Sequence, residues 1–189
     1  MKVQNSDATL FKAKMVIKNP SNNYVMDELA KKFQRLTESS PNDVVNLTIL
    51  GGKNAKGYRL SLGDGLNDSV ILTESNFDNM KSAPALLDTF VKTFNALKVN
   101  SKYNQEIGLL KEDKNKLDNI TKDSVAFYVN NKKDDSRLIF FSKVKDYANS
   151  CKITLKNQLE NLQAGRENAL KELSTDKLNF IDLLSYSIK

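Results

Sequence analysis

Histidine is absent from this 189-residue chain, and cysteine occurs once, at Cys151. Without histidine the chain itself cannot supply a Ser-His-Asp or Cys-His catalytic group, a histidine-based zinc site or the usual general base at neutral pH. A single cysteine excludes an intramolecular disulfide and gives no sign of an oxidising compartment. Cys151 falls on the apolar stripe of a predicted helix, where we expect an unreactive, small hydrophobic side chain.

Long apolar runs are also missing, since no stretch reaches the roughly 18 residues that a membrane-spanning helix needs. A polar run follows Lys2, which is unlike a secretory signal, so we expect a cytoplasmic protein. The chain has 40% hydrophobic and 28% charged residues, a balance typical of a folded globular domain and not of a disordered chain.

Arginine is scarce in a basic protein: only four of the 29 basic residues are arginine, although the net charge is +6. The positive charge raises nucleic acid or an acidic partner as a binding candidate. Recognition of bases and phosphates usually relies on the planar, bidentate guanidinium group of arginine. The lysines also alternate with acids, as in segments 111–119 and 130–137, which is more typical of a solvated face than of a binding stripe.

The first half of the chain has the patterns of strands around one helix. Apolar residues alternate with polar ones over 9–18, β-branched residues dominate 43–50, and two further strands are predicted over 57–63 and 69–73. The last three strands form a predicted meander. Apolar residues at helical spacing, with acids early and bases late, predict a helix over 23–38.

The glycine pair at Gly51 and Gly52, with Lys53 and Lys56 after it, raises the question of a phosphate-binding loop. Such a loop needs a strand, a glycine turn and then a helix whose N-terminal amides face the anion. Here the second element is another strand, and the G-x-x-x-x-G-K-[ST] spacing is absent. We therefore interpret the segment as a hairpin loop in which glycine supplies a positive φ.

The second half is mainly helical in pattern. Helices are predicted from Ser75 to about Val99, with a break or fresh start at Pro84, and from Tyr103 to about residue 121 after a turn. Two aromatic and β-branched segments, 124–129 and 137–141, predict a second β-hairpin. Helical spacing resumes over 144–173 with an interruption near Gly165, and Ser174 or Thr175 can cap a last helix. The apolar pattern is too irregular to predict a coiled coil.

The sequence therefore predicts an α+β fold: antiparallel β-hairpins and a meander packed against amphipathic helices, with a helical C-terminal third. We expect an N-terminal α+β part over 1–98 and a helix, β-hairpin and C-terminal helices over 99–189, together forming one compact unit. Lining up the elements over 22–98 and 101–173 raises the hypothesis of two tandem α-β-β-α units.

Functionally, the sequence favours a non-catalytic protein-binding or assembly module, because the apolar faces of its C-terminal helices could be completed by a partner or a second copy. The first alternative is a sequence-independent nucleic-acid binder, recognised by its salt dependence, that uses the basic side chains of the two predicted hairpins: Lys53, Lys56, Arg59, Lys132 and Lys133. A carboxylate- or metal-dependent enzyme is the least favoured alternative, because spacing singles out no acidic pair. No catalytic residue, cofactor or metal ligand is predicted.

Overall fold

The computed structural model describes residues 14–18, 24–37, 43–51, 57–63, 68–77, 82–130 and 135–185. The chain divides into two compact units. The first, which we call the sheet unit, comprises Met1–Asn100 and Leu170–Lys189, and the second, the helical unit, comprises Ser101–Ala169.

The sheet unit contains a four-stranded mixed sheet in the order β1-β2-β3-β4. Its strands are β1 (Lys14–Lys18), β2 (Val44–Leu50), β3 (Gly57–Leu62) and β4 (Ser69–Thr73). The last three form an antiparallel meander, which confirms the predicted strands and the hairpin after Gly51, whose φ is 94°. Residues 52–56 of that connection lie outside the described ranges. Strand β1 instead pairs parallel with β2, which is possible because helix α1 (Tyr24–Leu36) lies between them in the chain.

Strand register places the buried side chains of neighbouring strands on one face of the sheet. Leu60 of β3 lies opposite Leu47 of β2 and Val70 of β4, and none of these three residues has exposed surface. Residues directly opposite one another in a sheet point to the same face. The intervening positions are more open, since Val44 and Ile71 are 40% and 44% exposed.

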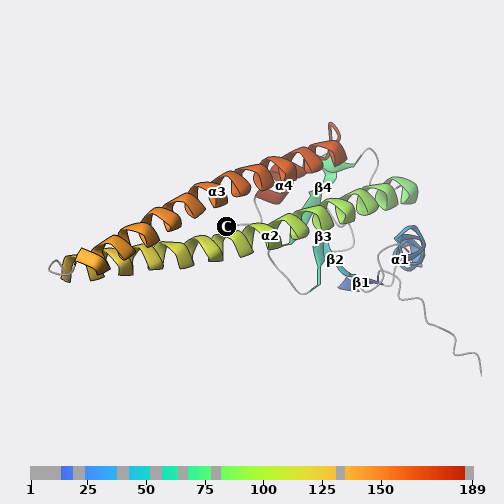
Figure 1. Cartoon of the computed structure of the whole chain (residues 1–189). Coiled ribbons are helices and arrows are strands. Elements are labelled where there is room, and N and C mark those ends of the chain that lie inside the picture. The colour runs from blue at the N-terminus through green and yellow to red at the C-terminus, as the bar shows by residue number, and fades with distance from the viewer. Residues whose placement is uncertain are drawn as a thin grey trace, which may run out of the picture. The chain divides into compact units, whose positions relative to one another are not determined.

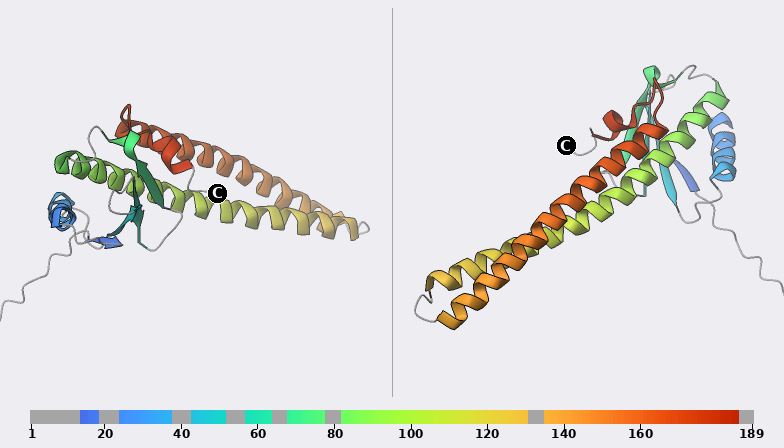
Figure 2. Two further views of the ribbon diagram at one scale, coloured as in Figure 1. Left: turned by 180° about the vertical axis from the view of Figure 1, so that it is seen from behind. Right: turned by 45° about the horizontal axis from the view of Figure 1, so that its top comes forward.

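Helices close the core over that face. Helix α2 (Ala83–Asn130) passes in front of the strands in Figure 1 and behind them in the reversed view of Figure 2, so its first part covers one side of the sheet. Phe33 of α1 meets Phe94 of α2 edge to face, with ring centroids 5.4 Å apart, and Phe90 meets Tyr58 at 5.3 Å. Such aromatic pairs add packing energy beyond the area they bury.

The end of the chain returns to the same core. Leu170, in the last turns of α3 (Asp135–Leu173), and Phe180 of α4 (Phe180–Ser185) are both buried there. The Ser174 hydroxyl accepts a hydrogen bond from the Phe180 amide at 3.0 Å, and the Asn179 side chain accepts one from the Ile181 amide at 3.2 Å. Ser174 therefore contributes to the N-terminus of the last helix, as predicted, together with Asn179.

The α+β fold is confirmed, but the predicted second hairpin is wrong. Residues 124–129 belong to α2 and residues 137–141 to α3, and the turn predicted near 99–103 and the break near Gly165 are helical as well. Short β-branched and aromatic runs do not by themselves separate a strand from a helix, and the long flanking helices decide between them. The tandem α-β-β-α hypothesis required this hairpin and is wrong for the same reason. Pro84 does mark a helix start, at the second residue of α2.

Within the described ranges, no helix combines the length and the apolar character needed to cross a bilayer.

We expect Leu60→Ala to lower the free energy of unfolding of the sheet unit by about 2–5 kcal/mol, because it leaves a cavity in a fully buried layer. Ile71→Ala on β4 is the matched control, since its side chain is 44% exposed, and we expect a much smaller loss. Urea denaturation of both variants measures the difference, and equal losses would contradict this assignment of the core face.

Candidate functional site

Helices α2 and α3 lie side by side and antiparallel within the helical unit (Figures 1 and 2). Their facing residues recur at steps of three, four and seven, the spacing of one helix side, and are buried or half-buried. From α2 these are Tyr103, Ile107, Leu110 and Leu117, and from α3 they are Ala148, Cys151, Leu155 and Leu162. We call this line of contact the seam.

Two contacts set the register of the seam. Asp118 Oδ1 lies 2.8 Å from Lys152 Nζ, and the Tyr103 ring packs against Gly165 further along. A Cβ atom at position 165 would lie 3.2 Å from the Tyr103 hydroxyl oxygen, so glycine lets this ring approach the helix backbone closely. A residue near the start of the α2 segment in the helical unit thus meets a late residue of α3, as antiparallel helices require.

A groove runs along one side of the seam. It has a volume of about 650 Å³, and its floor is formed by Leu117 of α2 and by Cys151 and Leu155 of α3, with Tyr147 beside them. The small side chains Ser150 and Thr154 complete the α3 wall. Among the described residues that line it, the charged ones are Asp113 and Lys116, which form an ion pair at 3.0 Å. The groove is therefore largely apolar and carries one charge of each sign.

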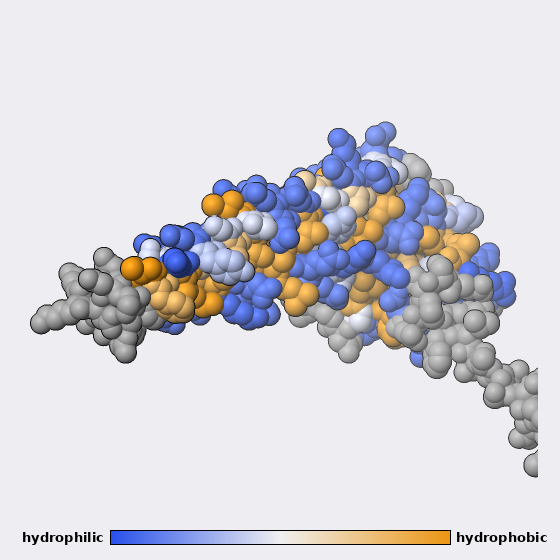
Figure 3. Space-filling view, viewed as in Figure 1, coloured by the Kyte–Doolittle hydropathy of each residue, from blue (hydrophilic) through white to orange (hydrophobic). Residues whose placement is uncertain are grey.

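Large hydrophobic side chains flank the groove and lie open to solvent. On α2, Leu109 and Ile120 share the side of Asp113 and Lys116, because steps of four, three and four residues separate them. On α3, Phe140 lies two helical turns before Tyr147 on the same side. The exposed fractions are 64% for Leu109, 44% for Ile120, 61% for Phe140 and 72% for Tyr147. We call the groove and these four residues the groove face; Figure 3 shows hydrophobic residues reaching the surface among hydrophilic ones.

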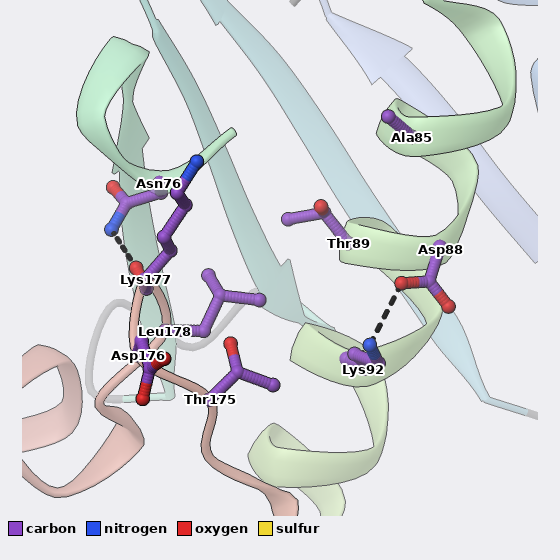
Figure 4. Close-up of a pocket in the computed structure, with 9 residues that line it drawn as sticks. All are labelled: Asn76, Ala85, Asp88, Thr89, Lys92, Thr175, Asp176, Lys177 and Leu178. Carbon is purple, nitrogen blue, oxygen red and sulfur yellow. Dashed lines mark hydrogen bonds and ion pairs between the residues drawn. The ribbon is translucent and has the colours of Figure 1, made fainter. Parts of the chain in front are cut away.

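The sheet unit has a second, more polar cleft of about 320 Å³ between α2 and the turn that precedes α4 (Figure 4). Its charged and polar groups largely serve one another: Asp88 pairs with Lys92 at 2.8 Å, and the Asn76 amide donates to the Lys177 carbonyl oxygen at 2.9 Å. The latter bond ties the turn to the short 3-10 helix Glu74–Asn76 that follows β4. These contacts explain the cleft as part of the attachment of the C-terminal segment to the sheet.

Of the five basic residues predicted for nucleic-acid binding, only Arg59 lies within the described ranges. Lys53 and Lys56 belong to the 52–56 connection, and Lys132 and Lys133 belong to the 131–134 connection. All four lie outside the described residues. Arg59 lies on the sheet face opposite the core, between Thr48 and Ile71 on the neighbouring strands. It is half-buried, and its Nε atom has no hydrogen-bond partner among the described atoms. Nucleic-acid binding stays a prediction.

Within the described ranges, no three cysteine, aspartate or glutamate side chains gather as a metal site would require. Lys116 in the groove has its pKa raised by the hydrogen bond and charge of Asp113, so its ammonium group is held protonated. A protonated lysine is neither a nucleophile nor a base.

The groove face could not be predicted from the sequence, because it is formed jointly by residues of α2 and α3 that lie far apart in the chain. The apolar stripes predicted for these helices also included Ile120 and Tyr147, which are 44% and 72% exposed, because a stripe alone does not tell which of its side chains a neighbouring helix covers. One signal was available in Leu109, a large hydrophobic residue that falls outside the steps of the seam, whereas Ile120 and Tyr147 continue those steps, three residues after Leu117 and four before Cys151.

We expect Lys152→Gln to raise the pKa of Asp118 toward its ordinary value of 3.8, because the hydrogen bond from Lys152 is the main cause of its lowered pKa. A carboxylate whose pKa is lower in the folded state than in the unfolded state stabilises the fold at pH values above its unfolded-state pKa. This contribution is lost as the pH falls through the folded-state pKa. Carboxyl NMR titration measures the shift. Lys156→Gln is the control, since Lys156 pairs with Glu160, and an equal shift there would contradict the register.

Comparison with known proteins gives no match, whether to a family model, to a curated protein or to a solved structure. Function is therefore inferred from the chemistry of the groove face.

Proposed function

We propose that this protein is a non-catalytic protein-binding module and that the groove face binds a partner polypeptide. The observation that carries the proposal is the gathering of four exposed hydrophobic side chains beside an apolar groove: Leu109, Ile120, Phe140 and Tyr147. Exposed apolar side chains that gather beside an apolar groove and are rimmed by polar residues are typical of an interaction site, whereas single exposed hydrophobic residues are common and carry no such meaning.

The composition of the groove face favours a polypeptide over a small molecule. Small-molecule sites are concave and aim several polar groups at one point, whereas here the two charged groups pair with each other along one helix. The groove between the two helices is open, its floor is apolar, and the side chains of Ser150 and Thr154 at its edge are small. Such a groove suits the apolar side of a further helix. Tyr147 is well placed as an anchor, because a rigid aromatic ring gives a large contact area at low entropic cost.

The test replaces Tyr147 with a photo-crosslinking phenylalanine analogue in cells that express the chain. The matched control carries the same analogue at Ile153, which is 64% exposed on the same helix but points about 120° away round its axis. We expect irradiation to join position 147, and not position 153, to a defined polypeptide that peptide mass spectrometry identifies.

Two results would contradict the proposal: no polypeptide adduct at position 147, or adducts of the same kind and yield at both positions. Circular dichroism checks that both variants keep the helical content of the unmodified chain. An adduct confined to position 147 supports the proposal whichever polypeptide is found.

A further inference from the structure

We infer that the polypeptide bound at the groove face is a second copy of this chain, docked groove to groove about a two-fold axis. This inference rests on the proposed function and names its partner. It follows from the order of side chains on α2 and from the register between α2 and α3, both of which meet the requirement that a two-fold interface be complementary to itself.

The side chains on the groove side of α2 are complementary to those of a second, antiparallel copy of the same helix. It presents Leu109, Asp113, Lys116 and Ile120 in that order: apolar, acidic, basic, apolar, at steps of four, three and four. When two such helices cross antiparallel at the midpoint between Asp113 and Lys116, each Leu109 meets the other copy's Ile120. Each Asp113 then meets the other copy's Lys116, so every favourable contact occurs twice.

The charges of the groove face select for this partner. Within one chain Asp113 and Lys116 already pair at 3.0 Å, with side chains that are 55% and 70% exposed. Docking a second copy exchanges these intrahelical partners for interhelical ones and leaves neither charge unpaired. A foreign helix would need an acid and a base of its own at the same spacing, and a partner of one charge sign would leave one of the two groups without a match.

The register between α2 and α3 supports the same two-fold axis, and this observation is separate from the order of side chains on α2. Equal steps counted along both helices from the Asp118–Lys152 contact place the midpoint of the α2 stripe level with a point between Leu155 and Lys156. The same count from the Tyr103–Gly165 contact places it between Ile153 and Thr154, so Thr154 and Leu155 bracket the mean of the two counts. Both residues line the groove. The proposed axis therefore passes through the groove on both helices, and the small Thr154 side chain lets the two α3 helices approach there.

The extent of this surface predicts a modest affinity. The complementary stripe covers about 17 Å of α2, the length of the eleven steps from Leu109 to Ile120. One turn further out the same register sets Glu106 opposite Asp123 of the second copy, two acids, so the stripe ends there. We expect a reversible dimer with a Kd on the order of micromolar, assembled as a four-helix arrangement from two helical units.

Charge reversal tests the register directly. Asp113→Lys alone places lysine opposite lysine twice, and Lys116→Asp alone places aspartate opposite aspartate twice. We expect each single variant to dimerise about tenfold more weakly than the unmodified chain. An equimolar mixture of the two variants restores both opposite-charge pairs, and so does the double variant D113K/K116D. Sedimentation equilibrium on all five samples measures the Kd, with Lys156→Asp, outside the groove, as the control.

Three sedimentation results would overturn the inference: an unmodified chain that stays monomeric up to about a hundred times the expected Kd, single reversals that leave dimerisation unchanged, or a mixture that fails to recover it. The failure of the proposed function is a separate result. If position 147 crosslinks to a different polypeptide, the groove binds protein but not a second copy; if it crosslinks to none, the groove is not a docking site.

Discussion

Two helices that pack against each other can bury only one stripe of each, and this constraint governs the helical unit. The seam takes residues such as Ile107 and Leu117 from α2 and Ala148 from α3, while Leu109 and Tyr147, beside the seam, keep most of their surface in water. The first part of the same α2 has the sheet and further helices around it, and its Phe90 and Phe94 are almost completely buried. A single continuous helix thus has a completed core in one unit and an incomplete one in the other.

This difference explains why the groove face, and not the polar cleft of the sheet unit, carries the functional proposal. In the cleft, the Asn76 amide donates to the Lys177 carbonyl oxygen and so holds the C-terminal segment, while Asp88 and Lys92 pair with each other along α2. Along the groove, Asp113 and Lys116 also pair, but Leu109 and Tyr147 near them are 64% and 72% exposed. Burying such side chains against another polypeptide is favourable in proportion to the apolar area removed from water.

The meander and α1 could be predicted from the sequence because their patterns are local. Residues 43–50 and 57–62, on either side of Gly51, alternate or are β-branched, and apolar residues from Met26 to Leu36 recur at helical spacing. The parallel pairing of β1 with β2 could not be predicted from local patterns, since it joins two segments that are separated by a helix. The second hairpin failed because 124–129 and 137–141 have the composition of strands, while their place next to long helices decided their conformation. Of the basic residues proposed for nucleic acid, Arg59 alone could be placed, on a sheet face and not at a loop tip.

The most direct test of the account uses Cys151, the only cysteine of the chain, which lies half-buried in the floor of the groove. Its rate of reaction with a bulky thiol reagent is measured across a series of protein concentrations. If a second copy covers the groove, the rate falls as concentration rises, and in the Asp113→Lys variant the same fall requires a higher concentration. A rate that is independent of concentration, in a protein that remains folded throughout, would contradict the account.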